Sequence, residues 1–247
     1  MDFLHVEQGK IVDSSNHPIA LRGVNVGGWM NMEHFINGHS GSEAHLRTLM
    51  RQELGAEKAE FFFDRLLDHF FNENDVRWLQ DRGVNLLRLP LNYRHFEDDM
   101  QPFEYLEKGF KRLDQTLEWC EKAGIYVLLD LHSVQGWQNG DWHCDNSSRH
   151  TQFWGQKQFQ DRFYALWKEI ARRYKHRPVI AAYDLINEPL SNAPFGRFAR
   201  DDQYRADWTN FNRIMDEAIA AIRSVDAQHM ILLEGDYYSV LFDGMAR

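Results

Sequence analysis

Cysteine, proline and long apolar runs are all scarce in this sequence. Its 247 residues include two cysteines, Cys120 and Cys144, and six prolines. Two cysteines are too few for the disulfide framework that staples many small secreted domains. We find no stretch rich in proline, glycine or serine that would mark a linker, and no apolar run long enough to span a bilayer. These absences favour a soluble globular domain that does not reside in a membrane.

Basic residues are outnumbered by acidic ones. The chain has 28 lysines and arginines against 37 aspartates and glutamates, and a net charge of −9. A negatively charged chain is a poor partner for nucleic acid or an anionic membrane, and we expect neither as a partner. The first ten residues, MDFLHVEQGK, lack the basic stretch followed by an apolar stretch that forms a secretion signal. We therefore expect a cytoplasmic protein, or a secreted one whose signal has been removed.

Hydrophobic side chains are plentiful enough for a large core. They make up 43% of the chain, aromatic residues make up 14%, and eight residues are tryptophan. The length is close to that of a typical α/β barrel domain. We therefore expect one domain over residues 1–247.

Short apolar runs alternate with amphipathic segments along the chain. Runs such as YVLLDL are apolar on both faces, which is typical of strands in a covered parallel sheet. Five such strands are expected, at residues 21–26, 84–91, 125–131, 179–187 and 230–235. Two short antiparallel strands are expected before them, within residues 5–23, with turns at Gln8-Gly9 and Asn16-His17-Pro18.

The segments between the strands have apolar residues at spacings of three and four, which predicts helices. These segments are residues 57–71, 73–82, 104–123, 153–175 and 205–225. Gly83 and Gly124 each follow a helical segment and precede a strand, where a helix C-terminal cap is expected. Repeated β-α order with right-handed crossovers gives either an open doubly wound sheet or a barrel.

Polar or aromatic residues end every expected strand, in the stretches NVGGW, RLPLNY, DLHS, NEP and EGDYY. Functional residues of a βα barrel lie at the C-terminal ends of many strands. The glycine-rich piece GVNVGG lacks the G-x-G-x-x-G spacing before a helix, so a dinucleotide site is the weaker interpretation. The expected fold is therefore α/β, of the TIM (β/α)8 barrel type, with about the first five βα units and an N-terminal β-hairpin.

Four motifs in order, LRGVNVGGW, LRLPLNY, LLDLHS and YDLINEP, resemble glycoside hydrolase family 5, in the clan of retaining (β/α)8 glycosidases. The resemblance covers most of the chain. The stretches DLHSVQGWQNGDWHCDNSS and GGWMNMEH are similar to the exo-β-1,3-glucanase branch of that family. The resemblance implies hydrolysis of β-glucosidic bonds in an oligosaccharide or polysaccharide, with no metal and no cofactor.

Glu188 follows a buried apolar run and precedes Pro189. A carboxylate at the end of a buried strand is costly unless it is used or paired. A carboxylic acid in a half-apolar cleft keeps its proton near neutral pH, as cleavage of a glycosidic bond requires. The resemblance implies that Glu188 is the general acid/base and that Asn187 donates a hydrogen bond to the sugar 2-hydroxyl. The alternative is that Asn-Glu-Pro only ends a strand.

Arg88 and His132 belong to two other strands of the expected sheet. A buried arginine needs a carboxylate partner. The resemblance implies that Arg88 lies under the active site and fixes the second carboxylate, whereas a structural ion pair with Asp130 or Glu234 is the competing interpretation. The resemblance places His132 beside the sugar at the cleavage point, and the alternative is a hydrogen-bonded core histidine.

The similarity to the exo-glucanase branch assigns Glu33, Asp145 and Asn146 to the sugar at the nonreducing end, which would favour cleavage from chain ends. Taken singly, each is more often an ordinary loop residue. Aromatic rings pack well on the C–H faces of pyranoses. Trp137 and Tyr238 are the candidates for that contact.

Two further features are expected to be structural. Cys120 and Trp154 are expected in helix cores. The cluster HCDNSSRH, residues 143–150, has His, Cys and Asp close together but lacks a C-x-x-C or H-x-x-x-H pair. A solvated loop is therefore favoured over a zinc site.

The second catalytic carboxylate is missing from the expected strands. A retaining glycosidase needs two carboxylates about 5–5.5 Å apart. In the family the nucleophile ends strand seven, whereas Glu234 matches strand five and is a doubtful nucleophile. We therefore expect a C-terminally incomplete barrel, completed by a longer chain, a second chain or another copy. Two hypotheses follow: a β-glucan hydrolase with its acid/base half here, or a non-catalytic carbohydrate-binding fragment or inactive half of a split enzyme.

Overall fold

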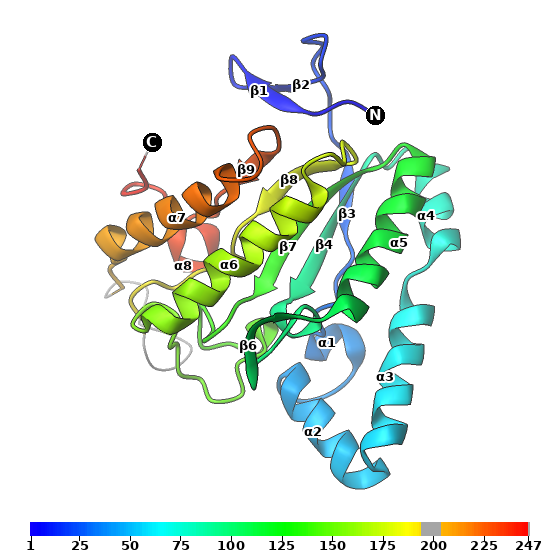
Figure 1. The fold of residues 1–247 in the computed structure, drawn as a ribbon, viewed down its shortest axis with the longest axis vertical. Helices are drawn as coiled ribbons and strands as arrows, with labels where there is room; N and C mark the ends of the chain where they lie inside the picture. Colours follow the sequence, from blue (N-terminus) through cyan, green and yellow to red (C-terminus); the bar gives the residue numbers. More distant parts are fainter. Residues whose placement is uncertain (194–203, 247) are drawn as a thin grey trace.

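The computed structural model describes residues 1–193 and 204–246. Its centre is a parallel sheet of five strands in the order β3-β4-β7-β8-β9 (Figure 1). The strands are β3 (Gly23–Asn25), β4 (Leu86–Asn92), β7 (Tyr126–Ser133), β8 (Ile180–Asp184) and β9 (Met230–Leu232). All five expected strands are present, and neighbours in the chain are neighbours in the sheet, which is the order of consecutive barrel units.

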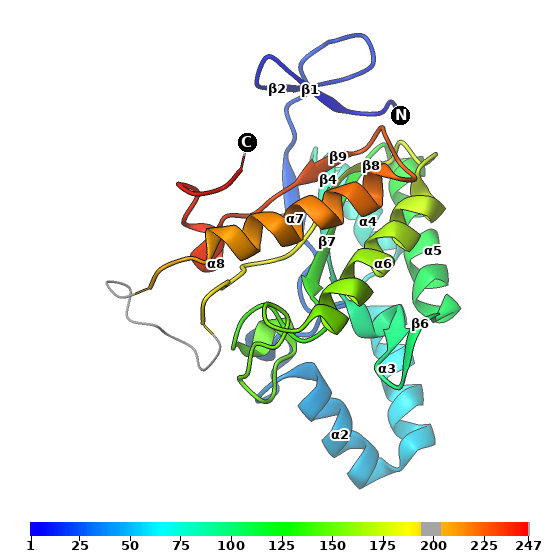
Figure 2. The same ribbon diagram turned by 60° about the vertical axis from the view of Figure 1, so that its left-hand side comes forward.

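Two antiparallel pairs accompany the sheet. The expected N-terminal hairpin is formed by β1 (His5–Glu7) and β2 (Lys10–Val12). It lies beyond the N-terminal ends of the parallel strands, away from the polar strand ends (Figures 1 and 2). The second pair, β5 (Glu97–Asp98) and β6 (Gln101–Tyr105), was not expected from the sequence.

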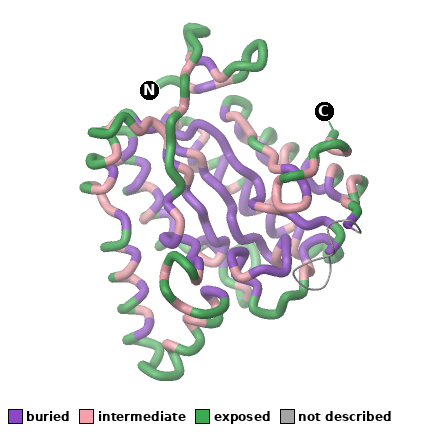
Figure 3. The backbone as a smooth tube through the Cα atoms, turned by 180° about the vertical axis from the view of Figure 1, so that it is seen from behind, coloured by how far each residue is buried: buried purple, intermediate pink, exposed green. Residues whose placement is uncertain are grey.

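Helices follow the strands. They are α1 (His34–Asn37), α2 (Glu43–Leu54), α3 (Ala56–Phe70), α4 (Glu73–Gln80), α5 (Glu107–Ala123), α6 (Lys157–Tyr174), α7 (Trp208–Arg223) and α8 (Asp236–Ser239), with short 3-10 turns η1 (Tyr93–His95) and η2 (Trp142–Cys144). Helices α5 and α6 lie over one face of the sheet (Figure 1), and the strands come to the front when the molecule is seen from behind (Figure 3).

Alternating side chains of each strand face the helices or the opposite side. Leu87, Leu89 and Leu91 of β4 are fully buried in one core with residues of α5 and α6. Between them, Arg88 and Pro90 point the other way, as the period of two in a strand requires. The register pairs Pro90 with Asp130 of β7, and Asp130 with Asp184 of β8. The sequence thus places charged side chains on the face that the helices do not cover.

Helix ends follow local chemistry. Asn72 and Asp75 form a reciprocal capping box at the start of α4. Gly124 is the left-handed cap of α5, with φ of 67°, as expected. Gly83 also has a positive φ of 74°, but α4 ends at Gln80, so Gly83 belongs to the turn that follows rather than to the cap itself.

The expected helix boundaries were partly wrong. Helix α6 begins at Lys157 rather than at residue 153, and α7 begins at Trp208 rather than at residue 205. Trp154 is buried, but it lies in the turn before α6, where its indole N–H donates to the Gln138 carbonyl at 2.8 Å. Cys120 is buried in α5, as expected.

The sheet ends at β3 and β9. Val24 of β3 and Leu232 of β9 are 41% and 38% exposed. Across residues 1–193 and 204–246, we find no helix with the length and apolarity to cross a membrane.

Candidate active site

Arg88 is the hub of the polar strand ends. Its guanidinium lies 2.9 Å from an Asp130 carboxylate oxygen, 2.9 Å from Asp184 and 2.8 Å from Glu234. It also donates to Oδ1 of Asn187 at 2.9 Å. The sequence left Asp130 and Glu234 open as ion-pair partners, and both are in contact. One planar guanidinium with several donors is suited to such a divergent set of acceptors.

Three carboxylates surround the single positive charge of Arg88. Asp130 and Asp184 are buried, and burial raises the pKa of both above the ordinary range, although the charge of Arg88 opposes the rise. One oxygen of each, Oδ1, has no hydrogen-bond partner among the residues described by the structure. The carboxyl groups of Asp130 and Asp184 therefore bind a proton more tightly than ordinary aspartates do.

His132 ends β7 and is almost fully buried. Its Nδ1 lies 2.6 Å from Asp130, and its Nε2 lies 3.9 Å from the carboxylate of Glu33. Burial, followed by the charge of Arg88, lowers the pKa of His132 to about 4. The ring is therefore neutral near neutral pH, placed between a buried carboxylate and Glu33.

Glu33 comes from a different part of the chain, just before α1. Burial raises the pKa of its carboxyl group, the neighbouring imidazole of His132 opposes this rise, and the charge of Glu188 adds to it. The structure thus brings Glu33 and Glu188 close enough for one carboxylate to influence the other. Polar side chains are expected to gather in this way at the C-terminal ends of barrel strands.

Glu188 lies beyond the end of β8, after the buried residues Leu185 and Ile186. Its side chain is 41% exposed, and its Oε2 lies 3.2 Å from Nε2 of His143. Partial burial and then the charge of Glu234 raise the pKa of the Glu188 carboxyl group. The group is therefore reachable from solvent and holds its proton to higher pH than an ordinary glutamate does.

The loop after β7 holds the peptide groups around Glu188. The amide of Gln138 donates to the Asn187 carbonyl at 2.9 Å, and the amide of Asn139 donates to the Glu188 carbonyl at 2.9 Å. Asn139 also contacts Nε2 of His143 at 3.0 Å. Gln138, Asn139 and His143 were not expected as site residues. The QNG stretch was noticed only as a family likeness, and its hydrogen bonds depend on how the loop folds back.

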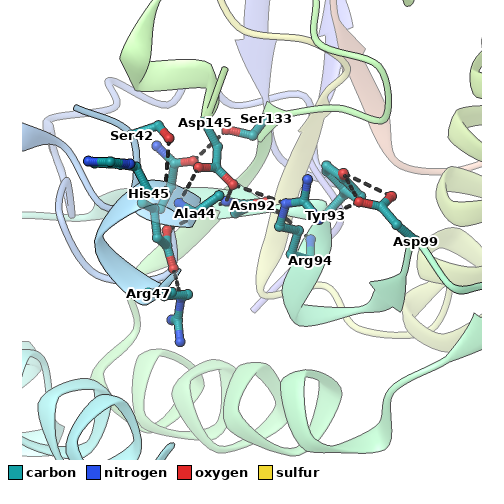
Figure 4. Close-up of polar contacts among 12 residues, drawn as sticks. Ser42, Ala44, His45, Arg47, Asn92, Tyr93, Arg94, Asp99, Ser133 and Asp145 are labelled. Atoms are coloured by element: carbon teal, nitrogen blue, oxygen red, sulfur yellow. Dashed lines mark hydrogen bonds and ion pairs between the residues drawn. The ribbon is translucent and has the colours of Figure 1, made fainter. Parts of the chain in front are cut away.

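Asp145 is part of a buried network that joins the loop to β4 and α2 (Figure 4). Its oxygens accept from the Ala44 N–H at 2.6 Å, the Asn92 amide at 3.1 Å and the Arg94 Nε at 3.1 Å. Neighbouring Asn146 donates to the Asn139 and His150 carbonyls at 2.8 and 3.1 Å. These contacts order the loop, and contact of Asp145 or Asn146 with a sugar stays a prediction.

The two aromatic candidates lie in irregular backbone near the site. Trp137 has a positive φ of 59°, and its indole nitrogen has no hydrogen-bond partner among the described residues. The Tyr238 hydroxyl donates to Asp141 at 2.7 Å, and its N–H reaches the Pro189 carbonyl at 3.3 Å. Their stacking on a sugar stays a prediction. Trp29 is buried in the core.

In the described part of the chain, no group of three or more His, Cys, Asp or Glu side chains is arranged to hold a metal ion. Cys144, in the cluster that was weighed as a zinc site, is buried and hydrogen-bonded to Asn139 and Asp141. Burial raises the pKa of its thiol, which disfavours the thiolate that a metal would need.

The parallel strands with a polar crown at their C-terminal ends define a βα-barrel domain. A model of the cellulase family, glycosyl hydrolase family 5, matches residues 60–246. The chain therefore belongs to glycosyl hydrolase family 5, and the resemblance drawn from its motifs is confirmed.

Relatives and solved structures agree with this family. A β-xylosidase from Phanerodontia chrysosporium is 42% identical over 239 residues, covering 97% of this chain and 47% of the relative. A probable glucan 1,3-β-glucosidase from Aspergillus clavatus is 31% identical over 191 residues, covering 74% and 44%. The crystal structure of a β-glucanase from Saccharophagus degradans matches with a TM-score of 0.58 at 20% identity, covering 96% and 55%. This likeness confirms the barrel-type fold. The chain spans about half the length of the curated relatives it matches.

Proposed function

We propose that this chain carries the acid/base half of a retaining glycoside hydrolase that cleaves β-glucosidic bonds in a β-glucan or related oligosaccharide. Glu188 is the general acid/base in this proposal. The observation that carries it is the carboxyl group of Glu188, which is reachable from solvent and has a raised pKa. The backbone on which it stands is held by Gln138 and Asn139 of the loop after β7. A glycosidic oxygen is a poor leaving group, and a carboxylic acid that keeps its proton can protonate it as the bond breaks.

Asn187 supports the same proposal. Arg88 holds Oδ1 of the Asn187 amide, and Nδ2 has no partner among the described residues. A buried amide donor without a partner costs free energy, and a sugar hydroxyl would satisfy it. Asn187 is therefore assigned to hydrogen bonding with the sugar next to the cleaved bond. Glu33 and His132 are assigned to further hydroxyl contacts, because the His132 ring lies 3.9 Å from the Glu33 carboxylate and His132 lies at the end of the neighbouring strand β7.

The nucleophile is assigned to a segment outside the residues described. Both oxygens of Glu234 are already engaged, and the sheet has open edges at β3 and β9. Parallel sheets in this class are covered on both faces and closed into a barrel. A longer chain, a second chain or another copy would close the barrel and place the second carboxylate opposite Glu188.

The substrate class follows the names of the relatives. One is a β-xylosidase and another is a probable glucan 1,3-β-glucosidase. Xylose and glucose differ by one hydroxymethyl group, which a pocket built to contact that group should distinguish. Comparing aryl β-glucosides with aryl β-xylosides is therefore the first assay, followed by β-1,3- and β-1,4-glucans.

The catalytic assignment is tested with Glu188→Gln in the complete enzyme. We expect turnover on an unactivated glucan to fall about 10²–10⁴-fold, with a smaller loss on an aryl glycoside whose leaving group needs little protonation. Glu217→Gln, on the exposed face of α7, is the matched control and should keep normal rates. Unchanged turnover on the glucan by Glu188→Gln would show that another group is the acid.

The second candidate function is carbohydrate binding without catalysis. The side chains of Glu33, His132 and Asn187 support it as well, because such groups bind hydroxyls whether or not a bond is cleaved. Calorimetry with oligosaccharides on this chain, alongside the activity assay on the complete enzyme, separates the two. Binding by a complete protein that hydrolyses no glycoside in the panel would favour the second function.

A further inference from the structure

Glu234 is a carboxylate whose role the proposed reaction leaves open. It follows β9 and its side chain is 13% exposed. Its Oε1 accepts from Arg88 at 2.8 Å. Its Oε2 accepts the backbone N–H of Glu188 at 2.7 Å and the hydroxyl hydrogen of Ser239. Glu234 therefore joins the strand ends of β4 and β9 to the peptide group of Glu188.

The backbone of Glu188 makes this contact informative. Its φ is 46°, in the left-handed region that residues with a side chain rarely adopt. Such a conformation is strained and persists only where the surroundings impose it. The carboxylate of Glu234 accepts a hydrogen bond from the N–H of Glu188, and the Asn139 amide donates one to the Glu188 carbonyl at 2.9 Å. The two contacts fix the peptide groups on both sides of the Cα atom, and hence the direction of the side chain.

The segment after β9 is itself in an unusual conformation. Tyr237, Tyr238 and Ser239 have φ of 54°, 54° and 65°. Within this segment, the Ser239 hydroxyl reaches Glu234, and the Tyr238 N–H reaches the Pro189 carbonyl at 3.3 Å. The segment thus runs against residues 188 and 189 on the side where Glu234 lies. Strained backbone concentrated at one place is typical of a functional site rather than of a core.

We propose that Glu234 is a positioning residue, whose carboxylate holds the Glu188 peptide in the left-handed conformation and so aims the Glu188 carboxyl group. This inference rests on the proposed role of Glu188 as the general acid/base. It also assigns Glu234 a role other than nucleophile. The two oxygens of Glu234 are oriented by Arg88 on one side and by Ser239 and the Glu188 N–H on the other, all within this chain.

The charge of Glu234 gives the proposal a second readout. It adds to burial in raising the pKa of Glu188. Glu234→Gln removes that charge and keeps a similar shape, so Glu188 should lose its proton at lower pH. The basic limb of the pH–rate profile should shift in the same direction. A residue that only stabilises the fold would leave that limb in place.

The first test uses this chain and needs no activity. The amide nitrogen shift of Glu188 and the titration of its carboxyl carbon are followed by NMR in wild type, Glu234→Gln and Glu217→Gln. We expect a changed amide shift and a lowered Glu188 pKa in Glu234→Gln alone. Ser239→Ala removes one hydrogen bond to Glu234 and should give a smaller change in the amide shift. An unchanged Glu188 amide in both variants would overturn the proposal, even if Glu188 were shown to be catalytic.

The second test uses the complete enzyme. Because misplacement by about 1 Å costs on the order of 10²-fold, Glu234→Gln should lower kcat on a glucan by about that factor with little change in KM. The loss should be smaller on an activated aryl glycoside. Trapping with a 2-deoxy-2-fluoro glycoside should label a carboxylate other than Glu234. A label on Glu234 would make it the nucleophile and overturn the positioning role, while loss of activity in Glu188→Gln would still support the proposed function.

Discussion

Replacement of Arg88 by methionine should destabilise this chain strongly and in a pH-dependent way. The guanidinium contacts Asp130, Asp184 and Glu234 at 2.8–2.9 Å, and two of these carboxylates are buried. Removing one partner of a buried ion pair costs about 3–5 kcal/mol, because the remaining charge has lost its compensation. A domain's whole stability is about 5–15 kcal/mol. The expected loss is therefore a large fraction of the total at pH 8.

The loss should shrink as the pH falls. Burial already raises the pKa of Asp130 and Asp184, and Arg88 opposes the rise. Without Arg88 the folded-state pKa of both rises further above the unfolded value. A carboxyl group whose pKa is higher in the folded than in the unfolded state destabilises the fold at high pH. This destabilisation is absent below the unfolded-state pKa and is complete above the folded-state pKa. Arg88→Met should therefore be closer to wild type at pH 5 than at pH 8.

Urea unfolding of this chain measures the effect. With an m-value of about 2 kcal/mol per M, a loss of 3–5 kcal/mol moves the midpoint by about 1.5–2.5 M. Arg77→Met is the control, because its partner Glu73 is 44% exposed and such pairs contribute about 0.3–0.5 kcal/mol. A midpoint shift below about 0.5 M at pH 8, or an equal shift at pH 5 and pH 8, would refute the reasoning.

Two further substitutions test the fold around the site. Gly109→Ala should destabilise by about 1–3 kcal/mol, because an added Cβ would lie 2.0 Å from the backbone oxygen of His95, and an unchanged melting temperature would contradict this contact. Asp226→Asn should destabilise at pH 7 and progressively less below about pH 4. Although burial raises the pKa of Asp226, hydrogen bonds, first from His229, lower it below its ordinary value, so its contribution is present at neutral pH and lost on acidification. An equal difference between the unfolding midpoints of Asp226→Asn and wild type at pH 3 and at pH 7 would contradict that role.

The strands could be predicted from the sequence because burial on both faces leaves a distinctive pattern. The run over residues 125–131 is apolar except for Asp130, and β7 (Tyr126–Ser133) covers most of it. Helix α2 was missed, although Leu46, Leu49, Met50 and Leu54 recur at helical spacing. In the structure Glu43 is its buried residue, and Leu49 and Leu54 are exposed. The pair β5–β6 was also missed, since residues 101–104 are exposed and lack alternation.

The candidate site, like the fold, could be predicted only in part from the sequence. Arg88, His132, Asn187 and Glu188 could be chosen as candidates because parallel strands end at one edge of a sheet, which brings their C-terminal residues together. The loop residues Gln138, Asn139 and His143 could not, since hydrogen bonds from a loop depend on its path rather than on a periodic pattern. Single sequence patterns also say nothing about φ at Glu188, on which the contact with Glu234 depends.

The contacts that hold Glu188 come from strand ends and loops within this chain. Its carbonyl is held from the loop after β7, its N–H by Glu234, two residues after β9, and its carboxyl group lies against His143. The exposed edges at β3 and at the outer side of β9 supply none of these contacts. The conformation and raised pKa of Glu188 should therefore be properties of this half of the barrel. In the function proposed here, closure of the barrel would add the second carboxylate and exclude water, and both would be needed for a positioned acid to catalyse hydrolysis.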